Sequence, residues 1–174
     1  ATISSEVYKH KKSLIDFKYD EVIATTTDSR ESQIYLSEKI TGNNENYPDL
    51  IANISLRVPD DLCIIQSTGE QKLLAASVCS PSYWNLKEKI GKSLREVHKP
   101  VKSLNEKIGN PIEKFIANAP INKPFKRENW FIHGDSNRYH TKAEGIPKTP
   151  IEHWVIRSER ETLCRYHEKY TLFA

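Results

Sequence analysis

The histidine at position 98 stands where its side chain could do chemistry. Residues 93–97 (SLREV) suit a short helical turn, and Pro100 biases Lys99 toward an extended backbone. The sequence therefore predicts that His98 lies at a corner between a helix and a loop. A ring fixed there can point into a pocket, where it can bind a metal or move a proton. The alternative is a packed, hydrogen-bonded histidine without a ligand, and the local sequence is compatible with both.

Two arginines, Arg127 and Arg160, lie in segments that read as strands and form the second candidate for chemistry. Arg160 shares one face of the strand 153–165 with apolar residues, so it is expected to be partly buried. A buried guanidinium needs an anionic partner, either a glutamate such as Glu128 or Glu159, or a bound carboxylate or phosphate. Two arginines facing one histidine would suit a planar anionic ligand, and haem, with two propionates and an iron, is one example.

The elements that must position these residues follow an α+β order. Two apolar runs, 61–67 and 72–79, are separated by a Thr-Gly-Glu-Gln turn and predict a central hairpin covered on both faces. Helices are expected at residues 30–40, 49–56, 80–91 and 105–118, and further strands at 126–133, 153–165 and 169–173. This order predicts one domain over residues 1–174, with a five-stranded antiparallel sheet and helices packed on one face.

Three finer expectations concern particular segments. Residues 1–12 are polar and basic and are expected to form a loose arm, followed by a short strand and a helical turn at 14–23. Ser80 before Pro81 suits the start of the helix 80–91. Trp130, in the strand that carries Arg127, is expected in the core.

Composition limits the classes of protein to which this chain could belong. The chain has 174 residues, 26 basic and 23 acidic, and a net charge of +3 spread along its length, which does not favour nucleic acid. No apolar run approaches the roughly 18 residues of a membrane span, and the first residues contain no apolar signal core. Three cysteines without a close pair do not describe a disulfide framework and favour a reducing, cytoplasmic location. A homo-oligomer remains compatible with all of this.

Several short motifs occur together in one order. Ser80-Pro81-Ser82 with Trp84, Glu88-Lys89-Ile90-Gly91 and Val97-His98 with Pro100-Val101 resemble the pattern PSxW, EKxG, IHxPV. Arg127 with Asn129-Trp130 resembles RxNW, and Arg157 with Glu159-Arg160 and Thr162-Leu163 resembles RxERQTL. As a set, over residues 14–173, they resemble the haem-dependent oxidative N-demethylase family of the α-subunit type.

That resemblance implies a PAS-like fold that binds haem b through a histidine. It also implies oxidative demethylation of a small secondary amine with O₂ and electrons from a reductase partner. Matched motif by motif, His98 is the expected axial ligand of the iron. The expected cofactor-binding set is His98, Arg127, Asn129, Arg157, Arg160 and Thr162.

The sequence departs from the family pattern at several positions. Glu161 stands where the family has glutamine, and Lys102 stands where a second proline is usual. The sequence also ends within the last predicted strand, where the family pattern implies further helices. These departures favour a PAS-like binding protein that holds haem, a pigment-like molecule or another planar or anionic ligand near His98, Arg127 and Arg160. The alternatives are the N-demethylase-type oxygenase itself and a domain with no ligand.

Overall fold

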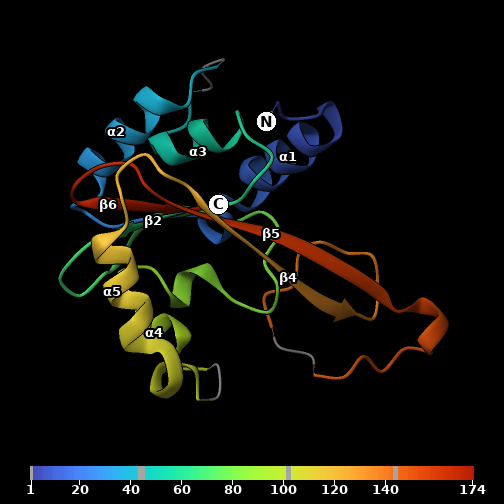
Figure 1. Cartoon of the computed structure of the whole chain (residues 1–174). Helices are drawn as coiled ribbons and strands as arrows, with labels where there is room; N and C mark the ends of the chain where they lie inside the picture. Colours follow the sequence, from blue (N-terminus) through green and yellow to red (C-terminus); the bar gives the residue numbers. More distant parts are fainter. Residues whose placement is uncertain (1, 43–45, 101–102, 143–144) are drawn as a thin grey trace.

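The centre of the molecule is an antiparallel β-sheet with helices on both sides. The computed structural model describes residues 2–42, 46–100, 103–142 and 145–174. Within these ranges the sheet has six strands in the spatial order β1-β3-β2-β6-β5-β4 (Figure 1). The strands are β1 (Ile23–Thr25), β2 (Leu62–Gln66), β3 (Leu73–Ser77), β4 (Phe125–His133), β5 (Val155–Arg165) and β6 (Tyr170–Phe173). The α+β class is confirmed.

The expected count of five strands is wrong because of β1. This three-residue strand follows the first helix directly and pairs with β3, Ile23 opposite Ser77. A strand of three residues shows no alternation of apolar and polar residues that a sequence pattern could reveal. The hairpin of β2 and β3 is confirmed and is central, with β1 on one side and β6 on the other.

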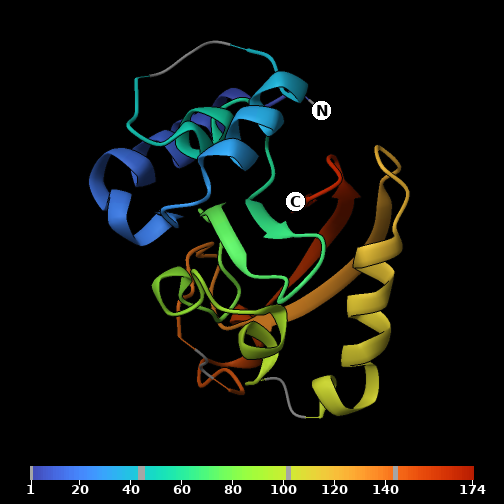
Figure 2. The same cartoon turned by 90° about the vertical axis from the view of Figure 1, so that its left-hand side faces the viewer.

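The helices cover both faces of the sheet, so the expectation of one covered face is wrong (Figures 1 and 2). Helices α1 (Ser5–Val22), α2 (Arg30–Lys39) and α3 (Leu50–Ser55) pack on one face, called here the upper face. Helices α4 (Leu94–His98) and α5 (Asn110–Asn118) pack on the lower face, together with η1 (Leu86–Glu88) and the π-helical turn η2 (Asn105–Gly109). Strand β2 supplies both cores, because Ile64 belongs to the upper cluster and Ile65 to the lower one.

Helix α1 replaces the expected loose arm and the expected strand after it. The Ser4 side chain caps its first turn, and Ile15 is fully buried. Lys11 is also buried, with 1% of its surface exposed, and its Nζ donates to the carbonyls of Val58 (3.1 Å) and Asp60 (2.7 Å). Because Lys11 is polar, it interrupts the apolar stripe on the buried side of α1, and that stripe is the sequence signal of an amphipathic helix.

Strands β4 and β5 form a long ribbon. They pair along all of β4, whereas β6 pairs with β5 from Leu163 to Arg165, and Ala174, directly after β6, adds two backbone hydrogen bonds to Thr162 (2.6 and 2.9 Å). The remainder of the ribbon extends beyond the body of the molecule (Figure 1). On it, Trp130 is 64% exposed and Ile156 is 73% exposed, so the prediction that Trp130 belongs to the core is wrong.

Candidate functional site

Helix α4 delivers His98 as its last residue. Ser93 caps the helix: its hydroxyl accepts from the Glu96 N–H (3.3 Å), and the Glu96 carboxylate accepts from the Ser93 N–H (2.9 Å). This reciprocal pair is the capping box, which fixes the start of a helix only five residues long. The predicted helical turn before His98 is therefore confirmed. Val101 and Lys102, which complete the motif, lie outside the described residues.

His98 lines a small hollow between α4 and the η2–α5 segment. The hollow is a shallow surface feature without room for a water molecule, and it is lined by Leu94, Arg95, His98, Leu104, Asn105, Gly109, Ile112 and Glu113. An ion pair between Arg95 Nε and a Glu113 carboxylate oxygen (2.5 Å) joins the two helices beside it. Enclosed ligand pockets usually contain about 300–1,000 Å³. A planar macrocycle would therefore occupy more than this hollow.

The surroundings of His98 favour a neutral imidazole. Partial burial lowers its pKa, and the cationic groups of Arg127 and Lys89 lower it further, while Glu161 opposes them. The Leu94 backbone acts in the same direction as Glu161 and raises the pKa slightly. A neutral imidazole is the form of histidine that binds a metal ion.

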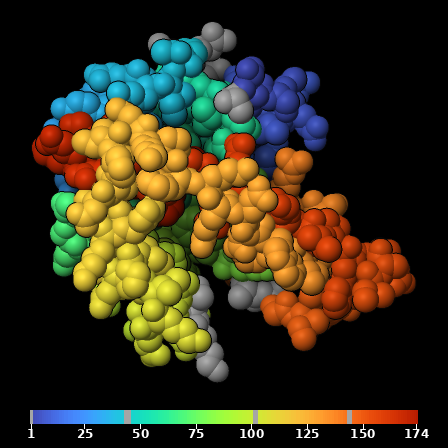
Figure 3. Space-filling model, in the orientation of Figure 1, coloured from blue at the N-terminus to red at the C-terminus, as the bar shows by residue number. Residues whose placement is uncertain are grey.

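Arg127 faces the same side of the sheet as His98. It lies opposite Glu161 in the β4–β5 register, and its Nε donates to the Glu161 carboxylate over 2.5 Å. The arginine side chain is 69% exposed and the glutamate side chain 33%. Asn129, two residues along β4, is half-buried, and its side-chain oxygen accepts from the Trp130 N–H. A notch separates α5 from the ribbon at this lower side of the molecule (Figure 3).

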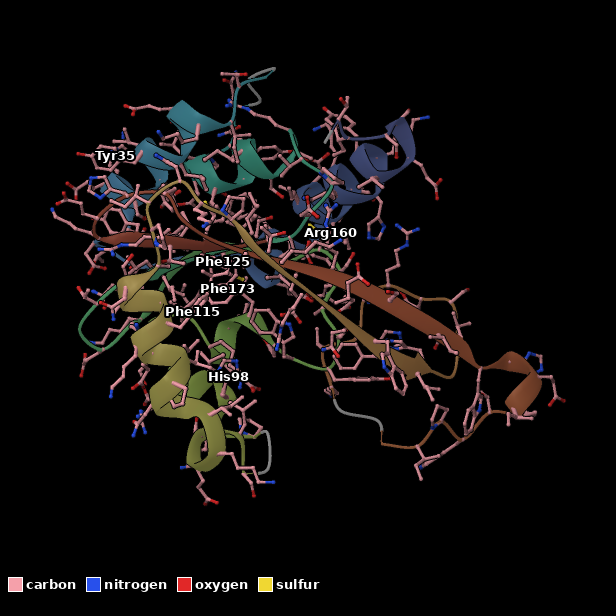
Figure 4. The ribbon with its side chains drawn as sticks, viewed as in Figure 1. Tyr35, His98, Phe115, Phe125, Arg160 and Phe173 are labelled. Carbon is pink, nitrogen blue, oxygen red and sulfur yellow. The ribbon has the colours of Figure 1, made fainter. Side chains whose placement is uncertain are left out.

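Arg160 lies on the upper face, away from His98 (Figure 4). Thr162, two residues further along β5, points to the same face because side chains alternate along a strand. The Arg160 guanidinium pairs with the Asp60 carboxylate over 3.2 Å, and half of its side chain (50%) is exposed. The expectation that Arg160 is partly buried among apolar residues is therefore wrong, and its partner is Asp60. Of the three residues expected around one pocket, the structure brings together only His98 and Arg127.

Arg157 binds the chain that precedes η1. Its guanidinium donates to the Ser80 carbonyl (2.5 Å) and pairs with Glu159 (2.9 Å). Glu159 in turn accepts a hydrogen bond from the Ser82 hydroxyl over 2.5 Å. Motif residues from β5 thus contact the Ser80-Pro81-Ser82 motif directly, so their first role in this structure is to hold that turn.

The predicted helix over residues 80–91 is wrong. Tyr83 has a φ of +65°, which no right-handed helix contains, and only the three residues of η1 are helical there. Asp61 accepts from the backbone N–H groups of Cys79 (2.9 Å) and Ser80 (2.8 Å), which holds the start of the segment. Contacts from distant parts of the chain override the local helix signal. Gly91 has a left-handed φ (+75°), which glycine adopts readily, although no long helix precedes it.

Two groups beside His98 were not among the expected site residues. Lys89 donates to the Val97 carbonyl at 3.0 Å, within one turn of His98, and Glu161 pairs with Arg127. The pairing of Glu161 with Arg127 depends on the register of β4 against β5, and no sequence pattern shows a register that spans such a long connection. Lys89 belongs to the EKxG motif, which could have indicated that it lies near the site.

The described part of the chain holds no group of three or more His, Cys, Asp or Glu side chains placed to bind a metal ion. Cys63, Cys79 and Cys164 are all free thiols. Across the described residues, none of the helices has the length and apolar character that a membrane span requires.

Fold and site together define an α+β protein with a histidine of lowered pKa beside a shallow hollow on the lower face of its sheet. The family model described as haem-dependent oxidative N-demethylase, alpha subunit-like, matches residues 8–171. The chain belongs to this family. No curated protein matches its sequence.

The residue types around His98 suit the chemistry of haem, whereas the hollow as it stands has no room for the macrocycle. Haem iron needs only one or two ligands from the protein, so a single free imidazole nitrogen is sufficient. Arg127 and Lys89 are cations within electrostatic reach of that ring, and haem propionates are anions. Leu94, Leu104 and Ile112 give the hollow an apolar wall.

Proposed function

We propose that this protein binds haem b through His98 and takes part in the oxidative N-demethylation of a small secondary amine. Membership of the family supports this function. The assignment to His98 rests on its place at the end of α4, where it lines the hollow near the cationic side chains of Arg127 and Lys89 and its pKa is lowered. Haem, when bound, supplies the iron at which O₂ and electrons from a reductase partner are used.

The PAS-like arrangement belongs to the same proposal. After β1 and the upper-face helices, the chain forms the hairpin of β2 and β3, then the lower-face helices, and then β4, β5 and β6, with β6 returning beside β2. This order supports a fold in which a ligand lies between the lower-face helices and the last strands. His98 and Arg127 both belong to that region.

Arg127 is the residue of the expected set that is best placed to meet a propionate. It is largely exposed, lies on the side of His98, and has a single carboxylate partner in Glu161. Arg157 would act indirectly, because its guanidinium is already engaged with Ser80 and Glu159. Asn129 would lie along the same side of β4, whereas Arg160 and Thr162 would remain outside the site.

A binding protein without catalysis is the second candidate. Glu161 stands where the family motif has glutamine, and its carboxylate neutralises the arginine beside His98. A planar ligand less anionic than haem, such as a pigment-like molecule, would suit such a neutralised site. The enzyme and the non-catalytic binding protein would hold their ligand at the same place, and only the enzyme would demethylate a substrate.

The test is haem reconstitution followed by absorption spectroscopy. Wild-type protein mixed with haem is expected to show a Soret band near ~400 nm, with stoichiometric binding. His98→Ala should lose that band, whereas His153→Ala, which removes an exposed histidine, should keep it. A wild-type protein that does not take up haem, or a His98→Ala protein with an unchanged spectrum, would overturn the proposal.

Catalysis is tested separately with the haem-loaded protein. A reductant, O₂ and a small secondary methylamine are supplied, and formaldehyde, the product of oxidative N-demethylation, is measured. Release of formaldehyde that depends on all three supports the enzyme. Haem binding without formaldehyde supports the non-catalytic binding protein.

A further inference from the structure

His133, at the end of β4, is buried without the hydrogen bonds that a histidine normally makes. It is 1% exposed, and neither of its ring nitrogens has a hydrogen-bond partner among the described residues. Buried polar atoms are nearly always paired, so an unpaired one needs a physical explanation. This residue is separate from the His98 site and takes no part in the function proposed above.

The ring of His133 lies where two distant segments meet. It stacks on Tyr83 from the turn before η1, with ring centroids 4.8 Å apart, and lies 4.5 Å from the ring of His140. The same two segments are joined by backbone hydrogen bonds, from Tyr83 N–H to the His140 carbonyl (2.8 Å) and from His140 N–H to the Pro81 carbonyl (3.1 Å). His133 therefore packs on the contact between the turn 81–83 and the segment 134–142.

A metal ion does not explain the two histidines. Their ring planes are inclined by only 33° at a centroid distance of 4.5 Å, which is a largely face-to-face arrangement. An imidazole binds a metal in the plane of its ring, and two rings that face each other do not direct their lone pairs at one point. The Nε2 atom of His140 is also within 2.9 Å of the Asn137 carbonyl.

The charged groups around His133 oppose a proton on its ring. Burial lowers its pKa most, and His140 and Arg157 lower it further. Glu159 and Asp135 act in the opposite direction. The Glu159 carboxylate is already shared by Arg157 and the Ser82 hydroxyl, and Asp135 lies 3.4 Å from His140 Nε2, with 57% of its side chain exposed.

We propose that His133 is an acid-sensitive contact, whose neutral ring holds the segment 134–142 against the turn 81–83 and whose protonation loosens it. The closed form accepts the proton poorly, because the ring is buried and no described group is placed to receive its N–H bonds. An open form exposes the ring to water and binds the proton with an ordinary affinity, near pH 6.5. As the pH falls below that value, proton binding therefore shifts the equilibrium toward the open form, about tenfold for each unit by which the pKa is lowered.

The direct test is NMR of the wild-type protein without any ligand. The ring protons of His133 are expected to titrate below pH 6.5. Over the same range, the amide protons of Tyr83 and His140 should exchange with solvent more readily, after correction for the intrinsic rate. The expected increase in the opening equilibrium from pH 7.5 to pH 5.5 is at least several-fold. A His133 ring that titrates at or above pH 6.5 would overturn the proposal.

Variants assign the effect to one ring. His133→Phe keeps an aromatic ring in the stack and cannot take a proton, so exchange at Tyr83 and His140 should no longer depend on pH beyond the intrinsic rate. His153→Phe, which changes an exposed histidine, should behave as the wild type. Unchanged pH dependence in His133→Phe would contradict the assignment, and the wild-type titration remains decisive if that variant does not fold.

Discussion

Arg160 and His98 lie on opposite faces of the same sheet (Figure 4). Neighbouring residues of a strand point to alternate faces, so the parity of a position decides which site its side chain can join. In β5, Glu161 faces the side of His98 and Arg160 faces Asp60. Consecutive residues of the RxERQTL-like motif therefore point to opposite faces of the sheet and cannot all line one site.

The first prediction is that Arg160→Ala leaves haem binding unchanged. The Arg160 guanidinium forms an ion pair with Asp60, and half of the arginine side chain is in water. Such exposed pairs contribute about 0–1 kcal/mol to stability. Haem titrations followed by absorption should give the same dissociation constant within twofold. Arg127→Ala is the matched change on the other face and should weaken binding. Loss of haem in Arg160→Ala with an intact fold would place the site on the upper face instead.

The second prediction concerns the pKa of His98 in the ligand-free protein. Arg127 lowers this pKa and Glu161 raises it, so the two sides of one ion pair have opposite effects. Arg127→Ala should raise the pKa, and Glu161→Gln should lower it further below 6.5. Because iron binds the neutral ring, haem uptake by the wild type should persist at a lower pH than an ordinary histidine allows. NMR titration of the imidazole measures the shifts, and shifts of the same sign in both variants would contradict the assigned neighbours.

The third prediction is a stability difference between adjacent aspartates. Asp61→Ala removes the acceptor for the Cys79 and Ser80 N–H groups and a negative charge near buried Lys11. We expect a loss of about 3 kcal/mol, because the buried donors are left unpaired. Asp60→Ala should cost less than about 1 kcal/mol, since its carboxylate pairs with a half-exposed arginine. Urea denaturation measures both, and equal losses would contradict this account of the turn.

The fourth prediction concerns the cap of α4. Ser93→Ala removes the hydroxyl that accepts from the Glu96 N–H, and the loss of such a cap costs about 1 kcal/mol. The same helix carries His98, so haem affinity should fall together with stability. Ser37→Ala, on the exposed side of α2, is the control and should change neither. Thermal melting with and without haem separates the two effects.

The sequence predicted the strands that carry a strong apolar or alternating pattern. The hairpin of β2 and β3 was predicted because both strands are buried on two faces and nearly continuously apolar, and β5 was predicted because it is long. Helix α1 was missed because Lys11 occupies a buried position, where its Nζ is satisfied by two backbone carbonyls. No composition rule anticipates such an arrangement.

The candidate site was predicted in part, for a related reason. His98 could be placed because the cap at Ser93 and Pro100 are local signals. The false helix at residues 80–91 shows the limit of local signals, since the conformation there depends on Asp61, Arg157 and Glu159, which come from other parts of the chain. Arg160 was misplaced because the sequence shows the alternation of a strand but not which face is covered.

The unequal support of β5 has a consequence for how this protein loses its structure. Toward its end, β5 has a neighbour on each side, but from Val155 to Glu161 β4 is its only strand partner among the described residues. Two strands alone are barely stable in water, so the outer ribbon owes its order to the side chains that reach the turn 80–83. We therefore expect the ribbon to melt as a unit before the rest of the sheet. The part of β5 that lies beside β6 should therefore remain folded after the outer part of the same strand has unfolded.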